Sequence, residues 1–124
     1  RKHSGDVAHA LEQIKAGRGD KKTEYLDINQ GKEMQISISA KSYYSFFSAN
    51  GKAVMGLNAP KMKSNTPLLW IAGSSDIITT NQDGKRIFDS APKNPKSKYI
   101  EVSGGHGDVG ENGSNEIVKW IKGL

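Results

Sequence analysis

Two short apolar segments in the second half of the chain predict the strands of a covered sheet. Residues 68–72 are continuously apolar and lie between a proline and a glycine. Such a run is typical of a strand buried on both faces, as in a parallel sheet covered by helices. Residues 98–102 form a second segment of the same length with apolar and polar positions mixed. We therefore predict an α/β fold with short parallel strands at about 67–72 and 98–102, flanked by helices.

Apolar residues at three- and four-residue steps predict helices elsewhere in the chain. Val7, Ala10, Leu11 and Ile14 form one such stripe, and a glycine follows at Gly17. Short polar residues suited to N-capping precede the stripes, and proline or glycine follows them. The predicted helices are 6–15, capped by Ser4 and ended by Gly17 or Gly19; about 39–48, capped by Ser37 or Ser39; 81–90, capped by Thr80; and 115–122, ended by Gly123.

Each predicted strand is followed by a loop of small residues that carries one reactive side chain. Asp76 follows the first strand in Gly-Ser-Ser-Asp, and His106 follows the second in Gly-Gly-His-Gly. Because the carboxyl ends of parallel strands meet at one edge of the sheet, these side chains are expected to lie close together. A carboxylate on one ring nitrogen fixes the tautomer of an imidazole and stabilises its protonated form. The two neighbouring strand ends therefore offer an acid and an imidazole.

Other interpretations of these two residues remain open at this stage. Gly-Ser-Ser-Asp is also a good turn sequence, so Asp76 could serve as a turn former or helix cap. His106 could be a surface histidine in a flexible glycine loop. Asp108 competes with Asp76 for the imidazole, but it lies only two residues beyond the histidine, so we expect it to act as a cap or loop residue.

This arrangement of loops resembles the C-terminal part of an α/β-hydrolase of the serine esterase and lipase type. In that family an acid loop and a histidine loop follow two successive late strands, with one helix between them, after an earlier serine. The residues contain no Gly-x-Ser-x-Gly. The resemblance thus implies that Asp76 and His106 serve a serine located upstream, and that residues 1–124 alone are inactive.

The resemblance also shapes the expected organisation of the chain. Its first residue is arginine, so we expect a C-terminal segment of a longer protein and one partial domain over 1–124. Within it, 1–65 are a helical, cap-like connecting segment and 66–124 carry the acid and histidine strands. The implied substrate is a small-molecule or lipid-like ester. The missing N-terminal half, or another chain, is expected to cover the open sheet edge.

Residues 24–48 show a conflict between local pattern and resemblance. Residues 24–31 are polar and are interpreted as a loop or short extended piece, while 34–39 alternate as in a half-buried strand. The hydrolase resemblance favours a helix with aromatic residues before the acid strand, so we predict the helix at about 39–48 and no strand before it. Its four aromatics are interpreted as core residues, with a substrate pocket as the alternative.

Composition limits the classes of function. The 124 residues carry a net charge of +5, but their lysines are scattered and no nucleic-acid-binding module is present, so we predict no nucleic-acid partner. No apolar run is long enough to span a membrane.

The chain has no cysteine, and His3 and His9 lack a second ligand at zinc-like spacing. Both histidines are therefore expected to be exposed, and no metal or cofactor is predicted. The alternative to a hydrolase is a non-catalytic α/β binding or structural domain.

Overall fold

The computed structural model describes residues 3–29 and 31–124 and divides the chain into two compact units. Unit 1 is Arg1–Val54 and unit 2 is Met55–Leu124. The division falls between Val54 and Met55, because the hairpin and helices before it form a core of their own.

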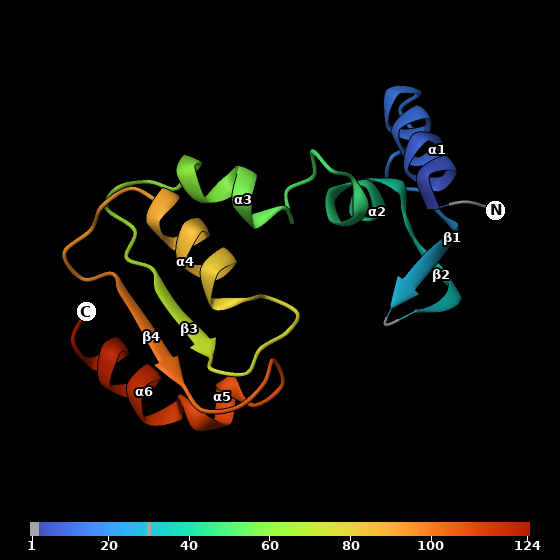
Figure 1. Cartoon of the computed structure of the whole chain (residues 1–124). Coiled ribbons are helices and arrows are strands. Elements are labelled where there is room, and N and C mark those ends of the chain that lie inside the picture. Colours follow the sequence, from blue (N-terminus) through green and yellow to red (C-terminus); the bar gives the residue numbers. More distant parts are fainter. Residues whose placement is uncertain (1–2, 30) are drawn as a thin grey trace. The chain divides into compact units, whose positions relative to one another are not determined.

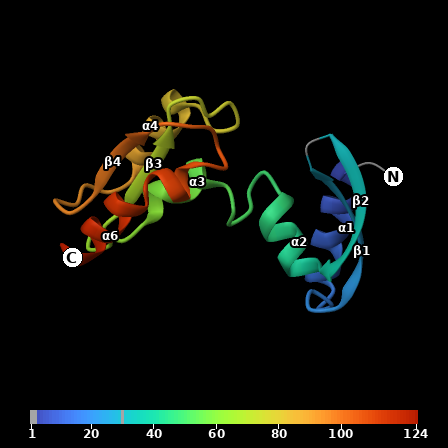
Figure 2. The ribbon, with the colours of Figure 1, turned by 90° about the horizontal axis from the view of Figure 1, so that it is seen from below.

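Unit 1 contains two helices and a β-hairpin (Figures 1 and 2). Helix α1 (His3–Lys15) is followed by a turn at Gly17, whose φ of 75° suits glycine. Strands β1 (Lys22–Asn29) and β2 (Lys32–Ser39) pair antiparallel, with Tyr25 opposite Ile36. Helix α2 (Ala40–Phe47) follows directly, and the Ser39 hydroxyl accepts the Ser42 N–H as its N-cap.

The hairpin corrects the prediction for this region. Residues 24–29 lie in β1, which fits the extended alternative of the prediction and not the loop, while residue 30 lies outside the described residues. Residues 34–39, for which the resemblance overrode the alternation, are a strand. The alternation was the better guide because Ile36 and Ile38 pack against the core around Tyr25. The helix predicted at about 39–48, with Ser39 as one of its two possible caps, is confirmed.

The core of unit 1 contains an aromatic stack, and two buried polar side chains next to it form hydrogen bonds with the backbone of β1. Tyr25 and Tyr43 are fully buried, and their rings stack at 4.3 Å between centroids. The buried Asp6 carboxylate accepts the Leu26 N–H at 2.6 Å, and the Tyr43 hydroxyl donates to the Leu26 carbonyl at 2.6 Å. The aromatics of α2 thus contribute to the core, as predicted, although Phe46 is exposed.

Unit 2 is a small α/β layer structure (Figure 1). Strands β3 (Leu69–Gly73) and β4 (Lys98–Val102) pair in parallel, with Ile71 opposite Ile100. Helix α4 (Asn81–Ser90) connects them, and the Thr80 hydroxyl accepts the Asp83 N–H as its cap, as predicted. The remaining elements are α3 (Met55–Asn58), the 3-10 helix η1 (Ala59–Lys61), α5 (Val109–Asn112) and α6 (Ser114–Lys122).

Helices lie on both faces of the parallel strands (Figure 1). On one face, Gly84 of α4 lies so close to Trp70 that an added Cβ would be 2.8 Å from the indole nitrogen. On the other face, Gly113 between α5 and α6 lies against Ile71. Because neighbouring residues of a strand point to opposite faces, Trp70 packs against the helical layer on one face and Ile71 against the layer on the other.

The predicted mixed α/β class holds at this coarse level, but burial is lower than the sequence suggested. Residues 69–71 of β3 are only partly buried, whereas the apolar run predicted burial on both faces. The two-stranded sheet leaves these side chains incompletely covered. Within the described residues, no helix is both long and apolar enough to cross a bilayer.

Candidate functional site

The loops that follow β3 and β4 are joined by backbone hydrogen bonds. The Ser74 N–H donates to the Val102 carbonyl at 2.8 Å, and the Ser75 N–H donates to the Gly104 carbonyl at 3.0 Å. Gly73, the last residue of β3, fits against the loop after β4 because it has no side chain: a Cβ there would lie 2.5 Å from the Gly104 oxygen. The loops after the two parallel strands are therefore fixed to each other at one end of the sheet.

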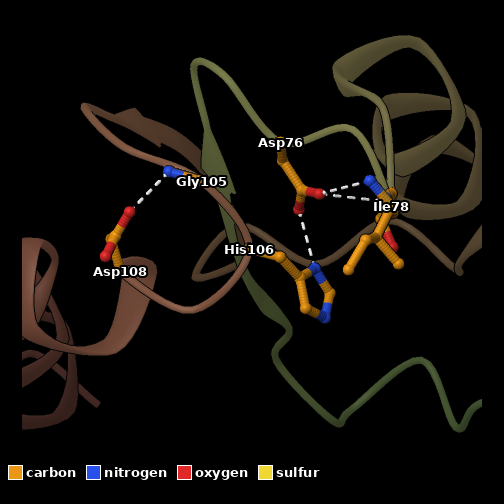
Figure 3. A network of polar contacts seen from close by, with 6 residues as sticks. Asp76, Ile78, Gly105, His106 and Asp108 are labelled. Carbon is orange, nitrogen blue, oxygen red and sulfur yellow. Dashed lines mark hydrogen bonds and ion pairs between the residues drawn. The ribbon is translucent and has the colours of Figure 1, made fainter. Parts of the chain in front are cut away.

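Asp76 and His106 meet across this junction, as the sequence predicted (Figure 3). The imidazole Nδ1 and the Asp76 Oδ2 are 2.9 Å apart. The Asp76 side chain is 7% exposed, whereas the His106 side chain is 53% exposed. The carboxylate is therefore covered while much of the imidazole faces solvent.

The second oxygen of Asp76 is held by its own loop. Oδ1 accepts the Ile78 N–H at 2.8 Å and the Thr79 N–H at 3.0 Å (Figure 3). Partial desolvation favours the neutral acid, but the hydrogen bond with His106 and these two N–H donors outweigh it, so the pKa of Asp76 lies below its ordinary value. The group is therefore ionised at neutral pH and can face an imidazole N–H.

Asp108 does not compete for the imidazole. Its carboxylate accepts the Gly105 N–H at 2.8 Å, and its own N–H donates to the Gly105 carbonyl. Gly104, with φ of 108°, adopts the backbone conformation that lets the loop turn before His106. The predicted loop role of Asp108 is confirmed, and its contacts brace the backbone from which His106 projects.

The remaining histidines lie in unit 1. His9 is exposed, as expected. His3 is only partly exposed, because its ring meets Phe47 edge-on at 5.0 Å between centroids. The aromatic face of α2 explains this difference. Among the described residues, no group of three or more potential ligands is arranged to hold a metal ion.

The backbone donors at Ile78 and Thr79 are the part of the site that sequence reasoning missed. An aspartate that accepts N–H groups two and three residues ahead forms a local turn. From the sequence alone, turn formation and pairing with histidine are alternatives for Asp76. The structure shows both, with one carboxylate oxygen for each, so the turn signal could have identified the donors.

Comparison with protein-family models, curated proteins and solved structures found no match to this chain. The geometry of the pair is therefore the basis for a function.

Proposed function

We propose that Asp76 and His106 are the acid and base of a serine hydrolase that cleaves esters or related acyl bonds. The nucleophilic serine is supplied by polypeptide outside residues 1–124. The observation that carries this proposal is that only one of the two ring nitrogens of His106 contacts Asp76. Asp76 occupies Nδ1 of the ring, which leaves Nε2 for a hydroxyl.

Each residue has a distinct task in this reaction. With its N–H at Nδ1 donating to Asp76, neutral His106 carries a lone pair on Nε2. Nε2 takes the serine proton as the serine oxygen bonds to the ester carbonyl carbon, and it then returns that proton to the departing alcohol. Water repeats the sequence on the acyl-serine and releases the carboxylic acid. Asp76 stays ionised throughout and stabilises the imidazolium.

The fixed position of Asp76 supports this role. Its Oδ1 is restrained by two backbone N–H groups, so the carboxylate cannot rotate freely away from the ring. Positioning of this kind lowers the reorganisation needed during proton transfer. A chance contact between two flexible surface side chains would have no such restraint.

The proposal is tested by ester turnover of the complete protein that contains these residues. We expect His106→Ala to lower kcat by about 10²–10⁴-fold, and Asp76→Asn to lower it as much or less. His9→Ala and Asp89→Asn are matched controls, because both residues are exposed and lie outside the pair. Unchanged turnover in His106→Ala would refute the proposed base. Residues 1–124 alone are expected to be inactive because they lack the proposed nucleophile.

A further inference from the structure

The two loops that carry the pair differ from the rest of the chain in charge. Of 18 lysines and arginines, none lies within residues 64–84 or 99–118. These segments contain both Asp76 and His106, and the acidic Asp108 follows His106 by two residues. A basic protein thus presents loops without cationic side chains around its candidate site. Such loops offer an anionic substrate group no cation to pair with.

Two large aliphatic side chains follow the acid directly. Ile77 is 90% exposed and Ile78 is 65% exposed. Adjacent isoleucines with this degree of exposure leave a large apolar area in water, where contact with another apolar group is favourable.

The position of these side chains is tied to the acid–base pair. The Ile78 N–H donates to Asp76 Oδ1, while Oδ2 of the same carboxylate faces His106 (Figure 3). The Ile77–Ile78 segment therefore has a defined place next to the pair. An apolar group that packs on this segment would lie next to Asp76 and its histidine partner.

We propose that the Ile77–Ile78 segment contacts the aliphatic part of the substrate, and that the substrate is a neutral ester with an aliphatic acyl chain. This inference rests on the function proposed above and narrows it to one substrate class. Hydrophobic contact gives a longer acyl chain greater stabilisation, whereas the absence of lysine and arginine from the loops disfavours a carboxylate on that chain.

The test compares 4-nitrophenyl esters in the complete protein. The probes are the acetate, the octanoate, the pentanoate and the hydrogen glutarate, of which the last two share a chain length but differ in charge. The variant is Ile77→Ser with Ile78→Ser, which keeps the N–H that binds Asp76. Ile77→Ser alone is a milder second variant. Ile121→Ser is the matched control, because Ile121 is 56% exposed on α6.

We expect the wild type to prefer octanoate to acetate and pentanoate to hydrogen glutarate in kcat/KM. The double variant should lose about tenfold of the preference for octanoate over acetate, and Ile121→Ser should keep that preference. Turnover of acetate with the same chain-length preference in wild type and double variant would overturn the substrate contact and leave the hydrolase proposal standing. No ester turnover above that of His106→Ala would overturn both.

Discussion

Replacement of Gly73 by alanine should disturb the candidate site without touching either of its side chains. The added Cβ would lie 2.5 Å from the Gly104 carbonyl oxygen and 3.1 Å from both the Gly105 oxygen and a methyl group of Val109. An ordinary C···O contact is about 3.3 Å, so the Gly104 carbonyl must move by about 0.8 Å. This oxygen is backbone and accepts the Ser75 N–H, so it cannot swing aside as a flexible side chain would.

The cost of this movement should appear in both stability and activity. Overpacking of this kind destabilises a protein by about 1–3 kcal/mol. For a unit of this size, each kcal/mol lowers Tm by about 4–8 °C. Because His106 follows the displaced carbonyl by two residues, the distance between Nδ1 and Asp76 should also change. A displacement near 1 Å can lower turnover by about 10²-fold.

Urea unfolding and long-range ¹H–¹⁵N correlation of the His106 ring measure the two effects separately. In the intact pair, Nδ1 of the neutral ring should carry the proton, and Gly73→Ala should weaken that preference. Gly107→Ala is the control, because a Cβ at Gly107 meets no atom within 4 Å. If Gly73→Ala matched Gly107→Ala in stability and in ring tautomer, the close packing of the two loops would not be what holds the pair together.

Two further predictions concern carboxylates in the two units. The pKa of Asp76 is lowered in the folded chain, so the ionised carboxylate stabilises the fold at pH values above its ordinary pKa of 3.8. This stabilisation is lost as pH falls through the folded-state pKa. In urea titrations, Asp76→Asn should therefore reduce the loss of unfolding free energy at acid pH. Asp6→Ala should lower the free energy of unfolding by about 1.5–3 kcal/mol, because the Leu26 N–H loses a charged acceptor. Asp20→Ala should lower it by less than about 1 kcal/mol, because the Asp20 side chain is 86% exposed. Equal urea midpoints for these two variants would contradict the structural role of Asp6.

The second half of the chain followed its local sequence signals closely. The strand at 98–102 and the helix at 81–90, with Thr80 as its cap, were predicted with the observed boundaries. Proline, glycine and a capping threonine mark the ends of these elements through local backbone preferences, which can be recognised without knowledge of tertiary contacts. The approach of Asp76 to His106 was also predictable, since parallel strands connected by one helix bring their following loops together.

The first half was predicted less well because a resemblance was given more weight than the residues. The alternation in 34–39 indicated a strand, and its partner at 22–29 was hidden by polar residues on both faces. Strand β1 is also held by the burial of Tyr25 against Tyr43 of α2, a contact between residues 18 positions apart. The short helix α5 was also missed, since its four residues, Val-Gly-Glu-Asn, form no apolar stripe.

The contacts to Leu26 have a consequence for how unit 1 meets other molecules. An unpaired strand margin offers N–H and C=O groups to any extended peptide, and this is how many proteins begin to aggregate. At the midpoint of β1 both groups are already engaged, one by the carboxylate of Asp6 and the other by the hydroxyl of Tyr43. A foreign strand could not extend its ladder through Leu26 without first displacing two buried side chains, so strand addition at this edge of β1 is disfavoured.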